Sequence, residues 1–168
     1  MLLVITGEVK SGKTEFLRRL VRSLRGLKVV GIIAPTIVKE GEIQGYEALL
    51  LPGGERFQLV ARSGEGDRVG RRYVLLKCAK ERIRERFKKP VEADFYVFDE
   101  FGPLELTGKG LVEVFNGFYS TGKDMAVVVR KSVLEKFLKR VNRDDIRVVG
   151  VGEVDPVNLA ELIRRERR

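Results

Sequence analysis

The chain has 168 residues, of which 43% are hydrophobic and 34% charged, and its formal net charge is +9. This length is enough for one domain with a core of its own, and the composition excludes a disordered, collagen-like or low-complexity chain. One cysteine and no histidine exclude a disulfide framework, a Cys/His zinc site, and Ser-His-Asp or Cys-His catalysis. No apolar run approaches the roughly 20 residues of a membrane span, and the start lacks the marks of a secretory signal, so we expect a cytoplasmic protein without membrane contact.

The first predicted elements are a strand, a glycine-rich turn, a helix and a second strand. Leu2–Ile5 is a short apolar run typical of a buried strand. After the turn, apolar residues recur with helical spacing, which predicts one buried helix face made of Phe16, Leu17, Leu20, Val21 and Leu24. Gly26 ends this helix, and Lys28–Ala34 forms the second strand.

Residues 35–77 have a different pattern, in which short β-type runs alternate with glycine turns and polar loops. The expected strands are Thr36–Val38, Ile43–Leu51, Phe57–Ala61 and Arg72–Lys77, with a polar loop at Ser63–Gly70. Closely spaced strands joined by short turns are typical of antiparallel hairpins. We therefore expect an inserted antiparallel lobe over about residues 35–77.

The remainder of the chain alternates helices and strands. The expected helices are Cys78–Lys89, a stripe at Leu111, Val114, Phe115 and Phe118, a helix from a capping box at Ser132 and Glu135 through Val141, and a last helix capped by Asp155 with its apolar face at Leu159, Leu162 and Ile163. The strands between them are Asp94–Asp99, Met125–Val129 and Ile146–Val151. This order predicts an α/β fold over residues 1–168 as a single domain, with a mostly parallel sheet covered by helices on both faces.

The turn after the first strand fits the pattern G-x-x-x-x-G-K-[ST]. In such a phosphate-binding loop, or P-loop, backbone N–H groups surround a phosphate at the start of a helix. The lysine reaches the β- and γ-phosphates, and the hydroxyl of the last residue binds Mg²⁺. The predicted nucleotide-binding residues are Gly7, Glu8, Val9, Lys10, Ser11, Gly12, Lys13 and Thr14.

Two acidic residues follow the buried strand Phe95–Phe98. Asp99 stands at the carboxyl end of that strand, the edge at which open α/β sheets bind ligands, and we expect it to hold Mg²⁺ together with Thr14. Glu100 follows directly and is the candidate to orient and deprotonate an attacking water. Without the P-loop upstream, a pair of solvated acids would be the better interpretation.

These segments resemble the THEP1-type nucleoside-triphosphatase family. The resemblance is carried by D-E-F-G-P-L-E-L at Asp99–Leu106 together with the P-loop. Weaker likenesses are the glycine-punctuated hairpin Gly41–Tyr46 and the segment Arg68–Gly70 followed by Tyr73, and the V-V-R ending at Arg130 is similar to a bacterial branch. The resemblance implies a RecA-like P-loop fold, Mg²⁺ dependence, and hydrolysis of ATP, GTP and other nucleoside triphosphates with little base preference.

The chain departs from the family pattern in places. Glu15 stands where a second threonine is usual, and Gly152–Leu159 lacks the Asn-Arg pair that many members carry near the last strand. Arg130, at the end of a predicted strand, is a possible replacement and a candidate to stabilise charge on the transferred phosphoryl group. Glu105 is suggested as an active-site acid by the family pattern alone, and a loop carboxylate is an equally good interpretation.

Other functions stay open at this point. The chain has the P-loop that a kinase would use to pass the γ-phosphoryl group to a small acceptor, and the lobe with Arg68, Arg71 and Arg72 has basic residues for a lid. A basic strand edge is the better interpretation of Arg71 and Arg72, and we expect Cys78 to be a small apolar residue facing the core. A nucleotide-gated RNA-binding switch would use the +9 surface, but the sequence has no RNP-like, zinc-finger or helix-turn-helix pattern, so nucleic acid is a possible but unfavoured partner.

Overall fold

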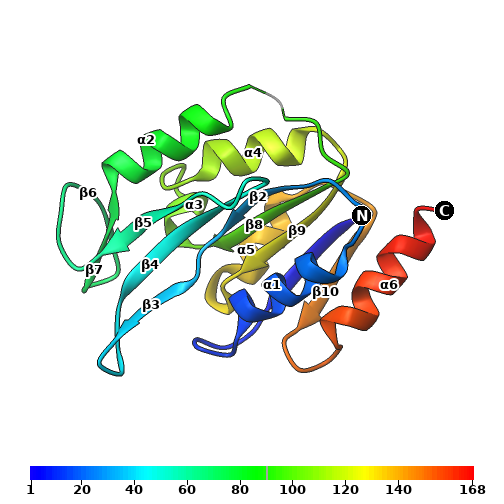
Figure 1. Cartoon of the computed structure of the whole chain (residues 1–168), viewed down its shortest axis with the longest axis horizontal. Helices are drawn as coiled ribbons and strands as arrows, with labels where there is room; N and C mark the ends of the chain where they lie inside the picture. Colours follow the sequence, from blue (N-terminus) through cyan, green and yellow to red (C-terminus); the bar gives the residue numbers. More distant parts are fainter. Residues whose placement is uncertain (90) are drawn as a thin grey trace.

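A ten-stranded mixed sheet runs through the computed structural model, which describes residues 1–89 and 91–168 (Figure 1). The strand order is β10-β1-β9-β8-β2-β4-β5-β7-β6, with β3 paired to β4. The strands are β1 (Leu2–Thr6), β2 (Val29–Ile33), β3 (Thr36–Lys39), β4 (Glu42–Leu51), β5 (Arg56–Ala61), β6 (Gly66–Val69), β7 (Tyr73–Leu76), β8 (Phe95–Phe101), β9 (Asp124–Val129) and β10 (Ile146–Gly150). The helices are α1 (Lys13–Ser23), α2 (Lys77–Arg86), α3 (Pro103–Leu106), α4 (Val112–Ser120), η1 (Lys131–Val133), α5 (Leu134–Arg140) and α6 (Pro156–Glu166).

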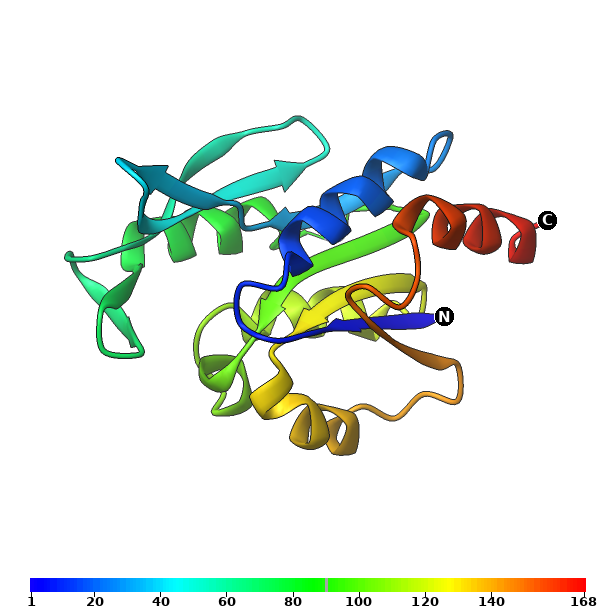
Figure 2. The same ribbon diagram turned by 90° about the horizontal axis from the view of Figure 1, so that it is seen from below.

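The parallel part of the sheet consists of β10, β1, β9, β8 and β2 and is covered by helices on both faces (Figures 1 and 2). Because successive side chains alternate between faces, strands buried on both sides need the near-continuous apolar runs seen in the sequence. α1 and α6 pack with one face, through Leu17, Leu20 and Ile163. α4 and α5 pack with the other, through Phe115 and Phe137, and α2 packs beside α4 on the antiparallel strands β5 and β7, with Ile83 in the same cluster. The predicted fold class is confirmed.

The antiparallel lobe continues the same sheet. β4 hydrogen-bonds antiparallel to β2, with Gly31 opposite Leu51, and β5, β7 and β6 follow outward. Gly31 has φ 151° and lies so close to β8 that a Cβ there would stand 1.9 Å from the carbonyl oxygen of Val97. Glycine at this position therefore lets β2 pair with the parallel strand β8 on one side and the antiparallel strand β4 on the other.

The structure differs from the sequence-based expectations at several element ends. The polar loop expected at Ser63–Gly70 contains β6, and α3 was not expected. The predicted capping box at Ser132 and Glu135 is wrong. Lys131–Val133 forms a 3-10 turn, and α5 begins at Leu134 without a side-chain cap. The cap on α6 is confirmed, because Asp155 accepts hydrogen bonds from the N–H groups of Val157 and Asn158. Leu162 was expected on the buried face of that helix but is 44% exposed, and Ala160 is buried in its place.

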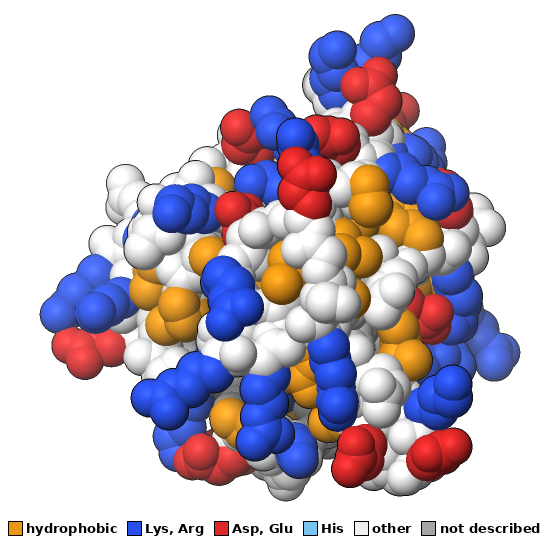
Figure 3. Space-filling view, turned by 90° about the vertical axis from the view of Figure 1, so that its left-hand side faces the viewer, with side chains coloured by type: hydrophobic (Ala, Val, Ile, Leu, Met, Phe, Trp, Pro, Cys, Tyr) orange, Lys and Arg blue, Asp and Glu red, His pale blue; other side chains and the backbone are white. Residues whose placement is uncertain are grey.

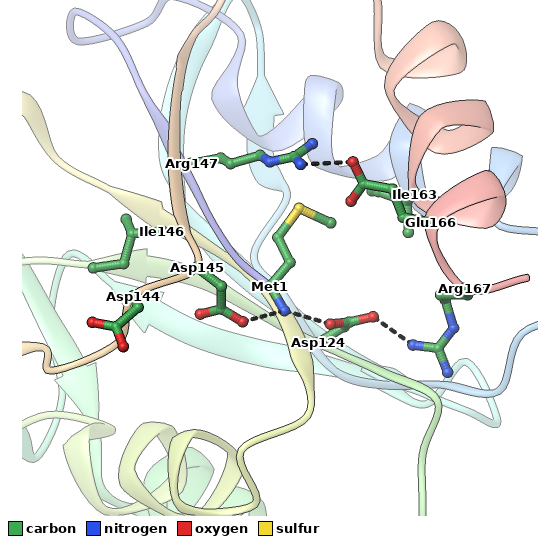
Figure 4. A pocket seen from close by; sticks show the side chains of 9 residues that line it. All are labelled: Met1, Asp124, Asp144, Asp145, Ile146, Arg147, Ile163, Glu166 and Arg167. Atoms are coloured by element: carbon green, nitrogen blue, oxygen red, sulfur yellow. Dashed lines mark hydrogen bonds and ion pairs between the residues drawn. The ribbon is translucent and has the colours of Figure 1, made fainter.

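Charged groups gather around a cavity of about 410 Å³ at the amino ends of the parallel strands (Figure 4). The N-terminal ammonium pairs with Asp124 at 2.5 Å and with Asp145 at 2.6 Å. Arg167, beyond α6, pairs with Asp124 at 2.6 Å. Arg143 and the N-terminal ammonium hold the pKa of Asp145 well below its usual range. These pairs connect β1, β9, β10 and the end of α6 at the edge opposite the P-loop.

Among the helices that residues 1–89 and 91–168 form, none is long and apolar enough to cross a membrane.

Candidate active site

The predicted site residues meet at the carboxyl edge of the parallel strands. β1 leads into the P-loop, β8 carries Asp99 and Glu100 at its end, and β9 leads to Arg130. Figure 3 views the molecule from this side and shows Lys and Arg side chains spread over much of the surface, with hydrophobic side chains visible between them. A basic surface at this edge favours the approach of polyanions such as nucleotides.

The P-loop turns tightly before α1. Gly12 is the N-cap of α1 with φ 87°, and Lys10 has φ 59°. A Cβ on Gly12 would have nothing within 4 Å, so in this structure the left-handed backbone, rather than close packing, requires glycine there. Gly7 is the crowded position, because a Cβ there would stand 2.5 Å from Oγ of Ser11.

Lys13 lies across the P-loop. Its Nζ donates hydrogen bonds to the carbonyl oxygens of Gly7 at 3.3 Å and Glu8 at 2.6 Å. The ammonium is thus held at the loop's own backbone, where a bound phosphate would replace the carbonyls as its partner. Outside the loop, the carboxylate of Glu8 forms an ion pair with Lys131 of η1.

Asp99 is a buried carboxylate beside the P-loop threonine. Its side chain is 5% exposed, and Oδ2 accepts a hydrogen bond of 2.9 Å from the N–H of Ala34. Oδ1 is buried without a hydrogen-bond partner among the described residues. Burial raises the pKa of Asp99 to about 7, and the N–H of Ala34 and the nearby hydroxyl of Thr14 oppose this only in part. A buried oxygen with a free lone pair next to a threonine hydroxyl suits a hard cation.

This donor set fits Mg²⁺ rather than a metal held by protein ligands alone. No cluster of three or more His, Cys, Asp or Glu side chains that could hold a metal occurs in the part of the chain that the structure describes. Mg²⁺ typically takes one or two protein oxygens and completes its shell with water and substrate phosphates. Thr14 and Asp99 would supply that number of protein ligands.

Glu100 occupies a β-bulge at the end of β8. The pairing of β8 with β9 shifts between Phe98 and Phe101, and Glu100 has φ 69°. In a regular strand Phe98 and Phe101 would face opposite sides, but the extra residue brings both into the same hydrophobic cluster. There Phe101 packs edge-to-face on Phe115 of α4, with ring centroids 4.9 Å apart. Burial of Phe101 therefore fixes the strained backbone of Glu100 from one side.

Arg130 holds the carboxylate of Glu100. Its Nε and Nη2 donate to the same carboxylate oxygen at 3.2 and 2.5 Å, and both side chains are about one-third exposed. The sequence placed Arg130 at this edge but gave no reason to pair it with Glu100. Their separation of 30 residues is spanned by adjacent parallel strands, so only the strand order reveals the contact.

Glu105 is the second buried carboxylate near this edge. It lies on α3 and is 9% exposed. Burial raises its pKa to about 7, and the nearby backbone N–H groups of Glu105 and Gly102 oppose this only in part. A glutamate at the third helical position facing the N–H of the N-cap residue is half of a capping box, which gives Glu105 a structural role in α3.

Sequence reasoning missed Tyr46, a residue of β4 that approaches the site from the lobe. It lines a cavity together with Glu100 and Arg130. Burial raises the pKa of Tyr46, and the negative charge of Glu100 raises it further. An aromatic residue on a lobe strand was the available signal, but it becomes informative only once β4 is known to pair with β2.

The remaining candidates are less central. Arg68 lines the same cavity as Tyr46, whereas Arg71 and Arg72 are exposed in the turn between β6 and β7. The expectation for Cys78 is wrong, since its side chain is exposed on α2 and Ala79 and Ile83 form the buried face.

Comparisons with known proteins find relatives of this chain by sequence. A family model described as NTPase matches residues 2–163. Proteins named nucleoside-triphosphatase THEP1 are similar in sequence, including one from Methanothermobacter thermautotrophicus (30% identity, covering 88% of this chain and 85% of the relative) and one from Ignicoccus hospitalis (33% identity, covering 84% and 82%).

Two solved structures share the fold over nearly the whole chain. THEP1 from the hyperthermophile Aquifex aeolicus superposes with a TM-score of 0.67 at 16% identity, covering 97% of this chain and 96% of that one. A human cancer-related nucleoside triphosphatase gives a TM-score of 0.70 at 19% identity, covering 99% and 96%.

Proposed function

Because the chain belongs to the NTPase family and hydrolyses nucleoside triphosphates, we propose that the residues at the carboxyl edge of the sheet divide this reaction among them. Backbone N–H groups of Gly7–Thr14 bind the phosphates at the start of α1. Lys13 leaves its two carbonyl partners and pairs with the β- and γ-phosphate oxygens. This exchange of a neutral partner for an anionic one strengthens the hydrogen bonds of the ammonium.

Thr14 and Asp99 would hold Mg²⁺. When bound, Mg²⁺ neutralises charge on the phosphate oxygens and favours departure of the diphosphate. Asp99 contributes its buried, unpartnered Oδ1, while Oδ2 stays fixed by Ala34. The hydrogen bond from Ala34 thus keeps the carboxylate in one orientation before the substrate arrives.

Glu100 orients the attacking water and accepts its proton. Arg130 keeps the carboxylate in position, because its Nε and Nη2 both donate hydrogen bonds to one carboxylate oxygen. Arg130 also adds positive charge beside the reacting phosphoryl group. The proposal is carried by one observation: Asp99, the neighbouring Thr14 hydroxyl, and the Glu100–Arg130 pair gather beside the P-loop.

Loose base selectivity is part of this proposal. A cavity of about 450 Å³ beside Gly12 is lined by Glu15, Arg19 and the loop Val151–Pro156. Among its described lining residues the one aromatic ring is Phe16, which is 6% exposed. The cavity therefore offers charge and backbone contacts to a nucleoside but little stacking. The continuous sheet further supports one catalytic domain over residues 1–168, with residues 35–77 as its lobe.

Release of inorganic phosphate from ATP, GTP, CTP and UTP, with Mg²⁺ and with EDTA, tests the proposal. We expect turnover of all four within about tenfold of one another, since base contacts discriminate weakly here. Turnover that persists in EDTA would refute the Mg²⁺ role. A single preferred base would refute the loose selectivity and leave the phosphate site intact.

A further inference from the structure

A second cavity, of about 300 Å³, opens between the lobe and the end of β8. It reaches Asp99, Glu100 and Arg130, but the described residues that line it include none of Gly7–Thr14. A triphosphate bound to the P-loop would therefore approach this cavity at Asp99 and Glu100 and leave the rest of its lining free. Glu100 lies between the phosphate site and this cavity, because it follows Asp99 beside the P-loop and also lines the cavity.

The walls of this cavity are largely apolar. One wall comes from the lobe and the other from the segment after β8, and the apolar lining includes Leu59, Val60, Val69, Leu75, Pro103, Leu104 and Leu111. Leu59, Leu75 and Leu111 are each no more than 6% exposed, so core side chains form part of its walls. Its volume is at the small end of ligand pockets.

Polar groups gather at the end nearest the reaction centre. Asp99, Glu100, Glu105, Arg130 and the ring of Tyr46 line that end, and Arg68 lines the cavity from the lobe. The three carboxylates outnumber the two arginines, and Arg130 is already paired with Glu100, so the lining disfavours an anionic ligand. The apolar walls in turn disfavour a ligand with a charged body. The matching chemistry is an uncharged apolar ring that carries a hydroxyl group, with the hydroxyl directed to Glu100.

We propose that this cavity binds a small, uncharged hydroxyl compound with an apolar ring, and that its hydroxyl replaces water as acceptor of the γ-phosphoryl group. The inference rests on the proposed role of Glu100. The hydroxyl oxygen forms a bond to the γ-phosphorus while the bond from that phosphorus to the β–γ bridging oxygen breaks, and its electron pair leaves with the nucleoside diphosphate. The hydroxyl proton passes to Glu100, and the products are a phosphate monoester and the diphosphate.

The test offers three probe alcohols to the full chain with ATP and Mg²⁺: benzyl alcohol, cyclohexanol and 4-(2-hydroxyethyl)phenol. ³¹P NMR separates the monoester from inorganic phosphate, and saturation-transfer NMR reports binding of the alcohol. We expect at least one monoester, with a monoester-to-phosphate ratio that saturates as the alcohol concentration rises. Saturation indicates a bound acceptor, since random capture by solvent alcohol would rise linearly.

A cavity-filling variant links the ratio to this site. Leu59→Phe adds volume to the lobe wall and should lower the ratio by about tenfold or more through lost acceptor contacts. Val69→Phe, from half-buried Val69 on β6, fills the same space if Leu59→Phe does not fold. The matched control is Val157→Phe on α6, where Val157 is 40% exposed and outside the cavity lining, and the ratio should stay unchanged.

The outcomes separate this inference from the proposed function. Phosphate release with no monoester and no alcohol binding overturns the acceptor site and leaves hydrolysis intact. A monoester ratio unaffected by both cavity-filling variants also overturns it. If Glu100→Gln releases phosphate at the wild-type rate, the role proposed for Glu100 fails, and the acceptor step that depends on it fails as well.

Discussion

Replacing Glu105 by glutamine should change how stability depends on pH. Burial raises the pKa of Glu105 from its ordinary 4.5 to about 7. The folded protein therefore binds more protons than the unfolded chain between these two values, and the free energy of unfolding falls as pH rises through that interval. The difference between these two pKa values corresponds to about 3 kcal/mol in the free energy of unfolding, and the 9% exposure of the side chain requires little discount for solvent screening.

Urea unfolding at a series of pH values from about 4 to 8.5 measures this effect. Glutamine is neutral and of the same size, so Glu105→Gln removes the proton linkage while its amide oxygen can still face the backbone N–H groups. Relative to wild type, the variant should gain up to about 3 kcal/mol on going from pH 4 to pH 8. Asp99 has a similarly raised pKa but is present in both proteins, so its contribution cancels in the difference. If the free energy of unfolding of the variant and of the wild type changed with pH in the same way, Glu105 would not be buried as the structure has it.

Three further substitutions test the catalytic proposal. Lys13→Ala should abolish turnover and weaken triphosphate binding, because Lys13 is the side-chain cation that the P-loop directs at the phosphates; wild-type rates would disprove the P-loop assignment. Asp99→Asn should weaken Mg²⁺ binding, measured as a higher Mg²⁺ concentration for half-maximal rate, and an unchanged Mg²⁺ dependence would contradict its role as ligand. Glu100→Gln should lower kcat by about 10²–10⁴ and leave binding of the Mg²⁺–nucleotide nearly unchanged, as expected for a group that acts mainly in the transition state. If Glu105→Gln gives that kinetic pattern and Glu100→Gln does not, the two glutamates have exchanged roles.

The parallel half of the fold could be predicted because its central strands are formed by continuous apolar runs. The runs at Leu2–Ile5, Phe95–Phe98 and Met125–Val129 all became central strands, and the alternating helices required a parallel sheet. The P-loop was equally accessible, since its glycines and lysine have fixed spacing within eight consecutive residues.

Elements stabilised by their neighbours rather than by their own sequence were missed. β6 consists of Gly66–Val69, which contains glycine and two charged residues, and it becomes a strand through pairing with β7. α3 is four residues long, too short for any helical period to appear. The Ser132–Glu135 box failed because the chain leaving β9 first makes a 3-10 turn.

The site likewise contains one feature that the local sequence predicts and others that depend on neighbouring elements. Asp99 was predictable from the end of an apolar strand, but the Glu100–Arg130 pair and the approach of Tyr46 depend on strand order and on one bulge. Neither feature leaves a local pattern in the sequence.

The way in which the lobe joins the sheet implies graded protection of its amide protons from hydrogen exchange. β4 is hydrogen-bonded on one side to β2 and β3 and on the other to β5, so its amides should exchange as slowly as those of the central parallel strands. β7 joins β5 through only the pairs Val60–Leu75 and Ala61–Val74, so the β6–β7 hairpin should open far more often. Because Val69 and Leu75 of this hairpin form part of the wall beside Glu100, each opening would briefly admit solvent or a small molecule to that space while the P-loop and Asp99 remain in place.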